Sequence, residues 1–497
     1  MSAQAQQKAP SKKKDKMASP VTYVNIAIGV ILMIAGFFLP PFYTITEVGM
    51  RILFIFIGVI YLWSTVETLW SSLLAIVMVG ISGFAPMSTV ITNSFGNTTV
   101  ILIFFSFVFF GGLVDCGVGK YISRFFLTRK ICNGHPYIFF FIYAFGLFVL
   151  AFLVKPFAAI MISWPISYII IQDLGYTRED KTAKFIVFLT FVGCILGQLS
   201  FPFRSSCLAI ITAFGNAYGS TIPFTSFLAF EVIMAACVIC CLVFIAKFVL
   251  RVDVTNLKKL NVEMFNKDPL PPMNSQQKFY SLMAIVYLVC MLLPSIFTGD
   301  TPFVKQLNTL GSTAITILVV VICSVVRLNG QQVLDFKKSC SKNMSWPVLF
   351  LVVVAIYFSS ALLNEATGIR PCIMAILNPL LGGRSMWALM CILCIFCFLL
   401  TNVANNQVCA MVILPAFGAF AQESGMPPEV VYPIATASIL CLYLAFLTPA
   451  ASPFAGMLFA NKEWLETSDI FKMAIPFAII IMVLYCTVGF FLGTILF

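Results

Sequence analysis

Long apolar segments alternate with short polar ones along almost the whole chain. A helix needs about 20 apolar residues to cross the hydrocarbon core of a bilayer, so each uninterrupted segment of that length predicts one transmembrane helix. These segments lie at 21–39, 48–65, 67–85, 98–115, 223–250, 278–298, 308–326, 345–363 and 471–495. The polar, basic segment 1–19 is expected to be a disordered cytoplasmic tail.

Two apolar segments, 134–172 and 385–421, are nearly twice as long as a single crossing and are broken in the middle. The first is interrupted at Lys155-Pro156 and the second between Asn402 and Gln407. Irregular backbone at membrane depth is tolerated only inside protein or around a watery cavity. We therefore expect each segment to enter and leave on the same side, as a re-entrant hairpin.

Two further segments, 184–218 and 430–459, are predicted to be broken transmembrane helices. Their interruptions are Phe201-Pro202-Phe203-Arg204 and Thr448 to Pro453. Broken helices at matching places in two halves of a membrane chain are typical of a transport site.

The two halves repeat each other at an offset of about 250 residues. Pro165 matches Pro415 at an offset of 250, and Pro202 matches Pro453 at 251. Because an odd number of crossings separates equivalent segments, the repeats are expected to be inverted in topology. We expect residues 20–250 to hold an extra first helix and repeat 1, residues 251–277 to form a cytoplasmic linker, and residues 278–497 to form repeat 2.

Composition and charge agree with a membrane protein and set its orientation. Hydrophobic residues make up 61% of the 497 residues and charged residues only 10%, against about 25% charged residues in soluble proteins. With a cytoplasmic N-terminus and two hairpins, 24 of the 30 Lys and Arg residues fall inside and four outside, as the positive-inside rule requires. The net charge of +11 is thus mainly a topology signal, and no nucleic-acid partner is expected.

The predicted fold class is an all-α polytopic membrane protein with 11 transmembrane helices and two re-entrant hairpins. We place it in a cell membrane (plasma or inner), with the C-terminus outside. The chain has 17 cysteines, mostly in apolar runs, and a single histidine, His135, in a predicted turn. This composition offers no convincing transition-metal site or catalytic triad, so the protein is not expected to be an enzyme.

Lys155 and Arg204 are the two cations left at the breaks, and no acidic residue lies in the break segments. A charged residue inside a membrane costs about 3 kcal/mol or more unless it is paired. An anionic ligand is the direct candidate partner, with Arg204 offering a bidentate fork and Lys155 a point charge. The alternatives are a distant acid, such as Asp115 or Glu231, or snorkelling to an interface.

The break in the second hairpin is rich in amides instead. Asn402, Asn405, Asn406 and Gln407 cluster there, and Thr448 and Ser452 offer hydroxyls at the matching helix break. The oxygens of Asn402, Asn405, Asn406 and Ser452 are candidate ligands for Na⁺. The amide nitrogens, with Thr448 and Ser452, are candidate donors to a carboxylate. These side chains could equally cap broken helix ends, and both roles can coexist.

With these segments and breaks, the chain resembles the divalent anion/sodium symporter family over residues 20–497. Family members carry Ser-Asn-Thr at each hairpin tip, with proline ten residues after the serine. This chain has Lys155-Pro156-Phe157 with Pro165, and Asn405-Asn406-Gln407 with Pro415. In the helix breaks, Arg204 stands where the family has Asn, and Ser452-Pro453 keeps a hydroxyl and the proline.

The resemblance implies a homodimeric, elevator-type transporter that binds a di- or tricarboxylate and two or more Na⁺ ions at the tips and breaks. Two fixed cations would repel Na⁺ in the first half, so Lys155 is hypothesised to replace one sodium ion. The expected function is organic-anion exchange, or transport with reduced Na⁺ or H⁺ coupling. A fully Na⁺-coupled symporter and a passive anion channel remain alternatives, as do arsenite-type or monocarboxylate substrates. Apart from Na⁺ as a candidate coupling ion, no cofactor is expected.

Overall fold

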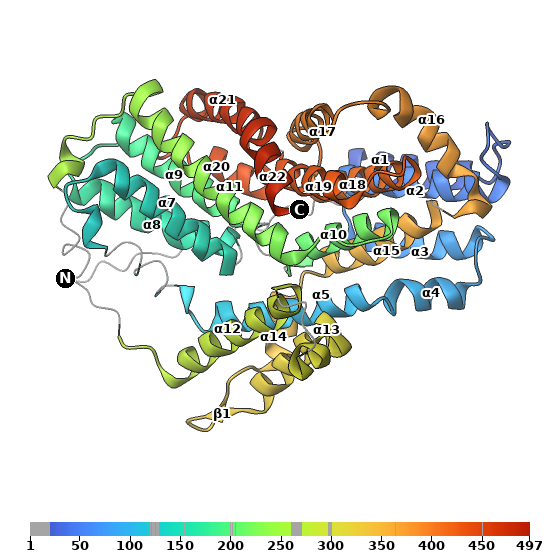
Figure 1. The fold of residues 1–497 in the computed structure, drawn as a ribbon, viewed down its shortest axis with the longest axis horizontal. Coiled ribbons are helices and arrows are strands. Elements are labelled where there is room, and N and C mark those ends of the chain that lie inside the picture. Colours follow the sequence, from blue (N-terminus) through green and yellow to red (C-terminus); the bar gives the residue numbers. More distant parts are fainter. Residues whose placement is uncertain are drawn as a thin grey trace.

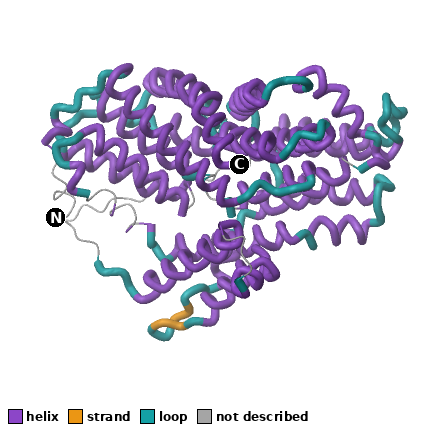
Figure 2. The backbone as a smooth tube through the Cα atoms, in the orientation of Figure 1, coloured by secondary structure: helices purple, strands orange, loops and turns teal. Residues whose placement is uncertain are grey.

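The computed structural model describes residues 20–119, 121, 125, 129–153, 156–198, 200, 202–203, 205–259, 271–296, 301–362, 364–449 and 451–497. Most of this part of the chain is helical (Figure 2). The strands β1 (Arg327–Leu328) and β2 (Gln331–Gln332) form a short antiparallel hairpin. The predicted N-terminal tail and the middle of the predicted linker lie outside the described residues.

The helices of the first half agree closely with the predicted segments. They are α1 (Pro20–Ala35), α2 (Glu47–Thr65), α3 (Leu69–Ile81), α4 (Met87–Phe95), α5 (Thr98–Asp115), α7 (Pro136–Leu153), α8 (Pro156–Asp173), α9 (Lys181–Leu196), α10 (Ser205–Tyr218) and α11 (Phe224–Phe244). Helix α11 continues as the π-helical turn η3 (Ile245–Val249), and short 3₁₀ turns lie at η2 (Lys130–Cys132) and η4 (Asn256–Lys259).

The second half begins with α12 (Ser275–Ile296) and α13 (Pro302–Val325). After the β-hairpin come α14 (Phe336–Asn343), α15 (Trp346–Leu362), the 3₁₀ turn η6 (Glu365–Thr367), α16 (Ile369–Leu381), α17 (Met386–Thr401), α18 (Asn406–Glu423), α19 (Pro428–Tyr443), α20 (Pro453–Ala460), α21 (Thr467–Leu484), the π-helical turn η7 (Tyr485–Gly489) and α22 (Phe490–Leu496). Sequence analysis did not predict α4, α14, α16 or the β-hairpin, because all four are too short or too polar to resemble a crossing.

Within the described residues, seven helices are long and apolar enough to cross a membrane, or up to nine if each of two bent pairs is one span. The bent pairs are α14 with α15, at 81°, and α16 with α17, at 108°. Five further apolar helices have only 10–17 residues. A mostly helical chain with several membrane-length helices is therefore confirmed, whereas eleven crossings and two hairpins stay a prediction.

Helix boundaries repeat at the offset found in the sequence. Helix α8 runs from 156 to 173 and α18 from 406 to 423, so both ends differ by 250. Pro165 and Pro415 lie inside these two helices at equivalent positions. Helices α9 and α19 each have 16 residues and each precede a break.

Helices from both halves of the sequence lie toward each end of the view in Figure 1. Helices α7, α8, α9, α20 and α21 lie toward one end of the view, and α1 to α4, α15, α16, α10 and α18 toward the other. Helices α9 and α19 are buried along nearly their whole length. A helix that is apolar all round belongs in an interior, so the broken helices form the centre of the molecule.

Candidate functional site

Helix packing brings the breaks of the two halves together. Helix α10 packs against α18, and α19 packs against both α17 and α18. At the end of α19, the Tyr443 hydroxyl donates to Gln407 Oε1 over 2.6 Å and lies within hydrogen-bonding reach of Ser206 in α10. The tip before α18, the end of α19 and the start of α10 therefore meet at one place.

Gln407 holds an unpaired donor at this place. The residue is only 9% exposed, and its Oε1 is occupied by Tyr443. Its Nε2 is buried and has no hydrogen-bond partner in the described structure. A buried donor without a partner costs about 1–3 kcal/mol, so a ligand oxygen that accepts from Nε2 would be favoured here.

Asn402 joins the second hairpin break to the unwound segment after α19. Its Oδ1 accepts from the backbone N–H groups of Phe446, at 3.0 Å, and Leu447, at 2.7 Å. Its Nδ2 donates to the carbonyls of Phe398 and Leu444. These four bonds satisfy backbone groups that no regular helix can satisfy, so Asn402 holds the framework of the site.

Asn405 and Asn406 cap the N-terminus of α18. Asn405 Oδ1 accepts from the N–H groups of Gln407 and Val408, at 3.0 and 3.2 Å. Asn406 Oδ1 also accepts from Gln407 N, at 2.8 Å. The positive end of the α18 dipole therefore lies beside the unpaired Gln407 amide.

Thr448 and Ser452 order the second helix break. The Thr448 hydroxyl donates to the Asn402 carbonyl at 2.8 Å. The Ser452 hydroxyl donates to the Ala445 carbonyl at 2.8 Å and accepts from Ala455 N at 3.0 Å, which makes it the N-cap of α20. Every predicted residue of the second half is thus found within the two adjoining breaks.

The polar residues of the second half were predicted to cap helix ends, to bind a ligand, or to do both. The capping role is confirmed for Asn405 and Ser452, and Asn402 satisfies backbone groups in a similar way. A carbonyl-type oxygen has two lone pairs; Asn402 Oδ1 and Asn405 Oδ1 each already accept two N–H bonds, whereas Asn406 Oδ1 accepts one. Na⁺ binding by Asn402, Asn405, Asn406 and Ser452 stays a prediction.

The predicted cations of the first half, Lys155 and Arg204, lie outside the described residues. Their neighbours are described: Pro156 begins α8, and Pro202 and Phe203 are buried. The ring of Phe203 lies 4.8 Å from that of Phe224, between centroids. The first break is therefore flanked by packed apolar side chains.

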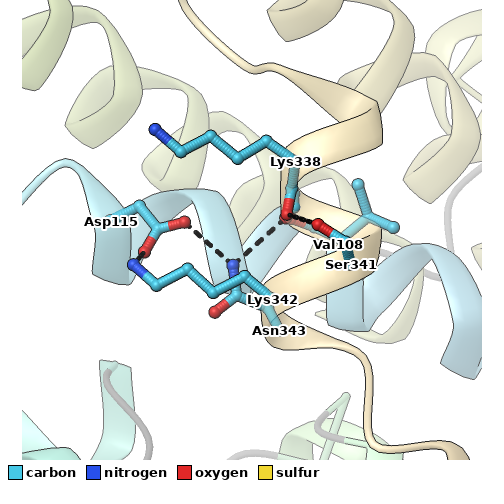
Figure 3. A network of polar contacts seen from close by, with 7 residues as sticks. Val108, Asp115, Lys338, Ser341, Lys342 and Asn343 are labelled. Carbon is cyan, nitrogen blue, oxygen red and sulfur yellow. Dashed lines mark hydrogen bonds and ion pairs between the residues drawn. The ribbon is translucent and has the colours of Figure 1, made fainter.

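Asp115 was one acid that could have paired with those cations. Figure 3 shows it bound instead to the Lys342 ammonium and to Asn343 Nδ2, the latter at 2.9 Å. Ser339 ties the same helix, α14, to the Val108 carbonyl at 2.9 Å. Burial, and then the Asp115 charge, raise the pKa of the adjoining Cys116 thiol to about 11. Asp115 therefore anchors α14 to α5.

Glu231, the other acid considered, is buried in α11 and contacts the residue just before the first break. Its Oε2 lies 3.4 Å from Ser200 Oγ, and the residue is only 3% exposed. Among the described residues, no ion pair is found for it.

Sequence reasoning missed Tyr443, Ser206 and Thr401 as members of the site. Thr401 is buried and its hydroxyl donates to the Leu442 carbonyl, next to the Asn402 bonds. Thr401 and Tyr443 could have been identified from the sequence, because each is a polar residue at the end of an apolar run, shortly before a break. Ser206 follows its break and gave no such signal.

Two curated proteins are similar to parts of this chain. The chain is 26% identical over 145 residues to "Uncharacterized transporter YfbS" of Escherichia coli (strain K12), which covers 29% of this chain and 23% of the relative. It is 22% identical over 217 residues to an "Uncharacterized transporter" of Haemophilus influenzae, which covers 42% of this chain and 44% of the relative. The chain thus spans less than half the length of these curated relatives.

One solved structure has a similar fold. It is described as "Crystal structure of the Alcanivorax borkumensis YdaH transporter reveals an unusual topology" and matches with a TM-score of 0.57. The match covers 82% of this chain and 87% of the other at 13% identity, so it speaks for the fold alone. Across residues 20–497 the chain matches the model described as "Sodium:sulfate symporter transmembrane region", and it therefore belongs to this family of membrane transporters.

Proposed function

We propose that this protein is a secondary active transporter of a small organic anion of the di- or tricarboxylate class. It works by an elevator mechanism, either as an anion exchanger or with reduced Na⁺ or H⁺ coupling. The observation that carries the proposal is the unpaired Nε2 of Gln407, at the point where the breaks of both halves meet.

The groups around Gln407 suit a carboxylate. Nε2 lacks an acceptor, and the N-terminus of α18 lies beside it. Tyr443 fixes the amide orientation by donating to Oε1, so that Nε2 is left for a ligand. A carboxylate oxygen accepts strongly from such donors. We place Asn405, Asn406, Thr448 and Ser452 in the same binding site through their remaining hydrogen-bonding capacity.

Lys155 and Arg204 supply the positive charge in this proposal. In the sequence Lys155 stands at the break of the first hairpin and Arg204 at the first helix break. Arg204 would bind the anion bidentately and Lys155 would stand in for a sodium ion. Two fixed cations already neutralise a dianion, which reduces the need for bound Na⁺. The family description names sodium and sulfate, and it keeps a fully Na⁺-coupled symporter as the main alternative.

The proposed elevator mechanism requires re-entrant hairpins, a mobile transport unit and a fixed scaffold. In the proposal, α7 with α8 and α17 with α18 are re-entrant hairpins whose tips meet the breaks near the membrane midplane. The transport unit moves against a homodimeric scaffold in the lipid bilayer of a cell membrane. The N-terminus is cytoplasmic and the C-terminus outside, as the distribution of Lys and Arg favours.

Transport in proteoliposomes tests the function directly. The purified protein is reconstituted and preloaded with a dicarboxylate, and uptake of labelled anion is measured with and without Na⁺ and a pH gradient. The panel includes a dicarboxylate, a tricarboxylate, a monocarboxylate and sulfate. We expect saturable counter-transport of di- or tricarboxylates; conductance without exchange would instead indicate a passive channel.

Lys155→Ser and Arg204→Asn test the two cations in the same assay. Each removes charge-assisted bonds worth about 1.5–3 kcal/mol, so we expect the anion affinity to fall about tenfold or more. Lys155→Ser should also increase the dependence on Na⁺. Lys305→Ser, at an exposed position, is the matched control. Unchanged affinity and ion dependence in both variants would refute the assigned anion site.

A further inference from the structure

Glu231 is a buried carboxyl group placed beside the first helix break. It lies in α11, is 3% exposed, and its Oε1 has no hydrogen-bond partner in the described structure. Its Oε2 lies 3.4 Å from the hydroxyl oxygen of Ser200, the residue directly before the break segment. A buried carboxylate with so few partners is costly unless a proton or cation compensates it.

The hydroxyl of Ser200 has a better acceptor than Glu231. Ser200 Oγ lies 2.8 Å from the Leu196 carbonyl and 3.4 Å from Glu231 Oε2. A hydroxyl has one proton to donate and two lone pairs to accept with. When that proton is directed to Leu196, the contact with Glu231 is a good hydrogen bond only if Glu231 itself carries the donated proton.

No cation of the elements that pack on α11 compensates Glu231 among the described residues. These elements are α7, α9, α12, α21, α22, η3 and η7. Helices α7 and α22 contain no charged residue, and Lys184 of α9 pairs with Asp469 of α21 at 2.8 Å. Lys181, Lys278 and Lys472 lie in the first two turns of their helices, and Lys247 lies over the Tyr137 and Phe248 rings.

The titratable group that faces Glu231 closely enough to interact electrostatically is Tyr485 of η7. Tyr485 in turn lies near the thiols of Cys441 and Cys394. A phenol and two thiols supply no positive charge at neutral pH. The surroundings therefore leave a proton as the simplest means of neutralising this carboxyl group.

We propose that Glu231 is a proton-binding site that couples anion transport to a proton gradient. The inference rests on the proposed transport function. The carboxylate takes a proton from water on one side of the membrane, and the resulting O–H donates to Ser200, which lies between α9 and the break. After the conformational change the O–H bond breaks and the proton leaves to water on the other side. Burial in the present conformation fits an occluded coupling site.

Glu231→Gln tests the proposal in reconstituted protein. Glutamine keeps the shape and neutrality of the protonated acid but cannot release a proton. One pH unit drives about tenfold accumulation per coupled proton. We expect the wild type to accumulate anion when a pH gradient is imposed, and Glu231→Gln to keep anion exchange at equal pH but lose this response. Glu429→Gln, at an exposed position of α19, should respond as the wild type does.

The assays separate failure of this inference from failure of the transport function. Anion exchange at equal pH tests the transport function alone. Four outcomes would each overturn the proton site. The pH response could persist in Glu231→Gln, or the wild type could show exchange without any pH response. The folded variant could lose exchange altogether, or it could lose a response to Na⁺ and not the response to pH. Infrared difference spectroscopy gives a readout without substrate: a protonated carboxyl stretch that titrates in the wild type should be missing from Glu231→Gln, and its presence there would refute the assignment.

Discussion

The two helix breaks occupy equivalent positions in the repeat, but their chemistry differs. The break after α19 contains neutral hydroxyls, and the adjoining hairpin break before α18 contains neutral amides; their bonds are mostly directed at the backbone. The break after α9 contains Arg204 in the sequence and has Glu231 against Ser200 in space, and Lys155 stands at the hairpin break before α8. The repeat therefore preserves the framework, whereas the chemistry of the two halves differs.

The difference suggests a division of labour between the halves. Neutral groups with several mutual bonds keep one geometry whatever the pH or the ligand, so the second break serves as the rigid side of the site. Ionisable groups change their charge when a ligand or proton binds, so the first break serves as the responsive side. Gln407 links them, because its partner Tyr443 reaches Ser206 of α10.

Asn402→Ala should have the largest effect on stability. The change leaves the buried N–H group of Phe446 and the partly buried N–H group of Leu447 without an acceptor, and an unsatisfied buried group costs about 1–3 kcal/mol. We expect a loss of about 3 kcal/mol or more, measured as a large fall in the unfolding temperature of purified protein in detergent.

Asn378→Ala is the matched control for this change. Asn378 is an exposed residue of α16, and a surface substitution of this kind changes stability by about 0.5 kcal/mol or less. Equal, small effects of the two variants would show that the second break is not the rigid framework inferred from its hydrogen bonds.

Gln407→Met should mainly affect anion affinity. Methionine is similar in size but removes the unpaired Nε2 together with the acceptor of Tyr443. Loss of one donor to a carboxylate costs about 1.5–3 kcal/mol, so the half-saturating anion concentration should rise about tenfold or more. Concentration-dependent exchange in proteoliposomes measures it.

Tyr443→Phe is the control that separates Nε2 from the Tyr443 bond. It breaks the same 2.6 Å hydrogen bond but leaves Nε2 in place. We expect it to lower stability by about 1 kcal/mol with a much smaller change in affinity than Gln407→Met. If the two variants lower affinity equally, the orientation of the amide matters and its free donor does not.

Much of the fold could be predicted from the sequence because the bilayer imposes a simple length rule. The apolar runs located nearly every long helix, and the repeat located the equivalent ends of α8 and α18. Helix α16 was missed because Arg370, Pro371 and Pro379 interrupt its 13 residues. Helix α14 was missed because it is short and polar.

The site could be predicted less completely than the fold. The breaks in the apolar segments identified six polar residues, because polar groups at membrane depth are costly unless they find partners. These residues are Asn402, Asn405, Asn406, Gln407, Thr448 and Ser452. The bond between Tyr443 and Gln407 could not be predicted, because it joins residues 36 positions apart and depends on how α18 packs against α19. Glu231 was considered from the sequence only as a distant counter-charge, and its contact with Ser200 could not be predicted because the two residues lie 31 positions apart.

Ser452→Ala should have the smallest effect and bears on whether the second break also binds a ligand. Loss of an N-cap costs about 1 kcal/mol, and Ser385→Ala, which removes the N-cap of α17, provides the matched comparison. If Ser452 only caps α20, both variants should lose similar stability and keep anion affinity and Na⁺ dependence. If it also contacts the anion or Na⁺, Ser452→Ala alone should weaken transport, and Ser452→Thr should restore it because threonine keeps the hydroxyl. A transport defect that Ser452→Thr does not relieve would place the fault in the shape of the break, and would remove the hydroxyl from the binding site.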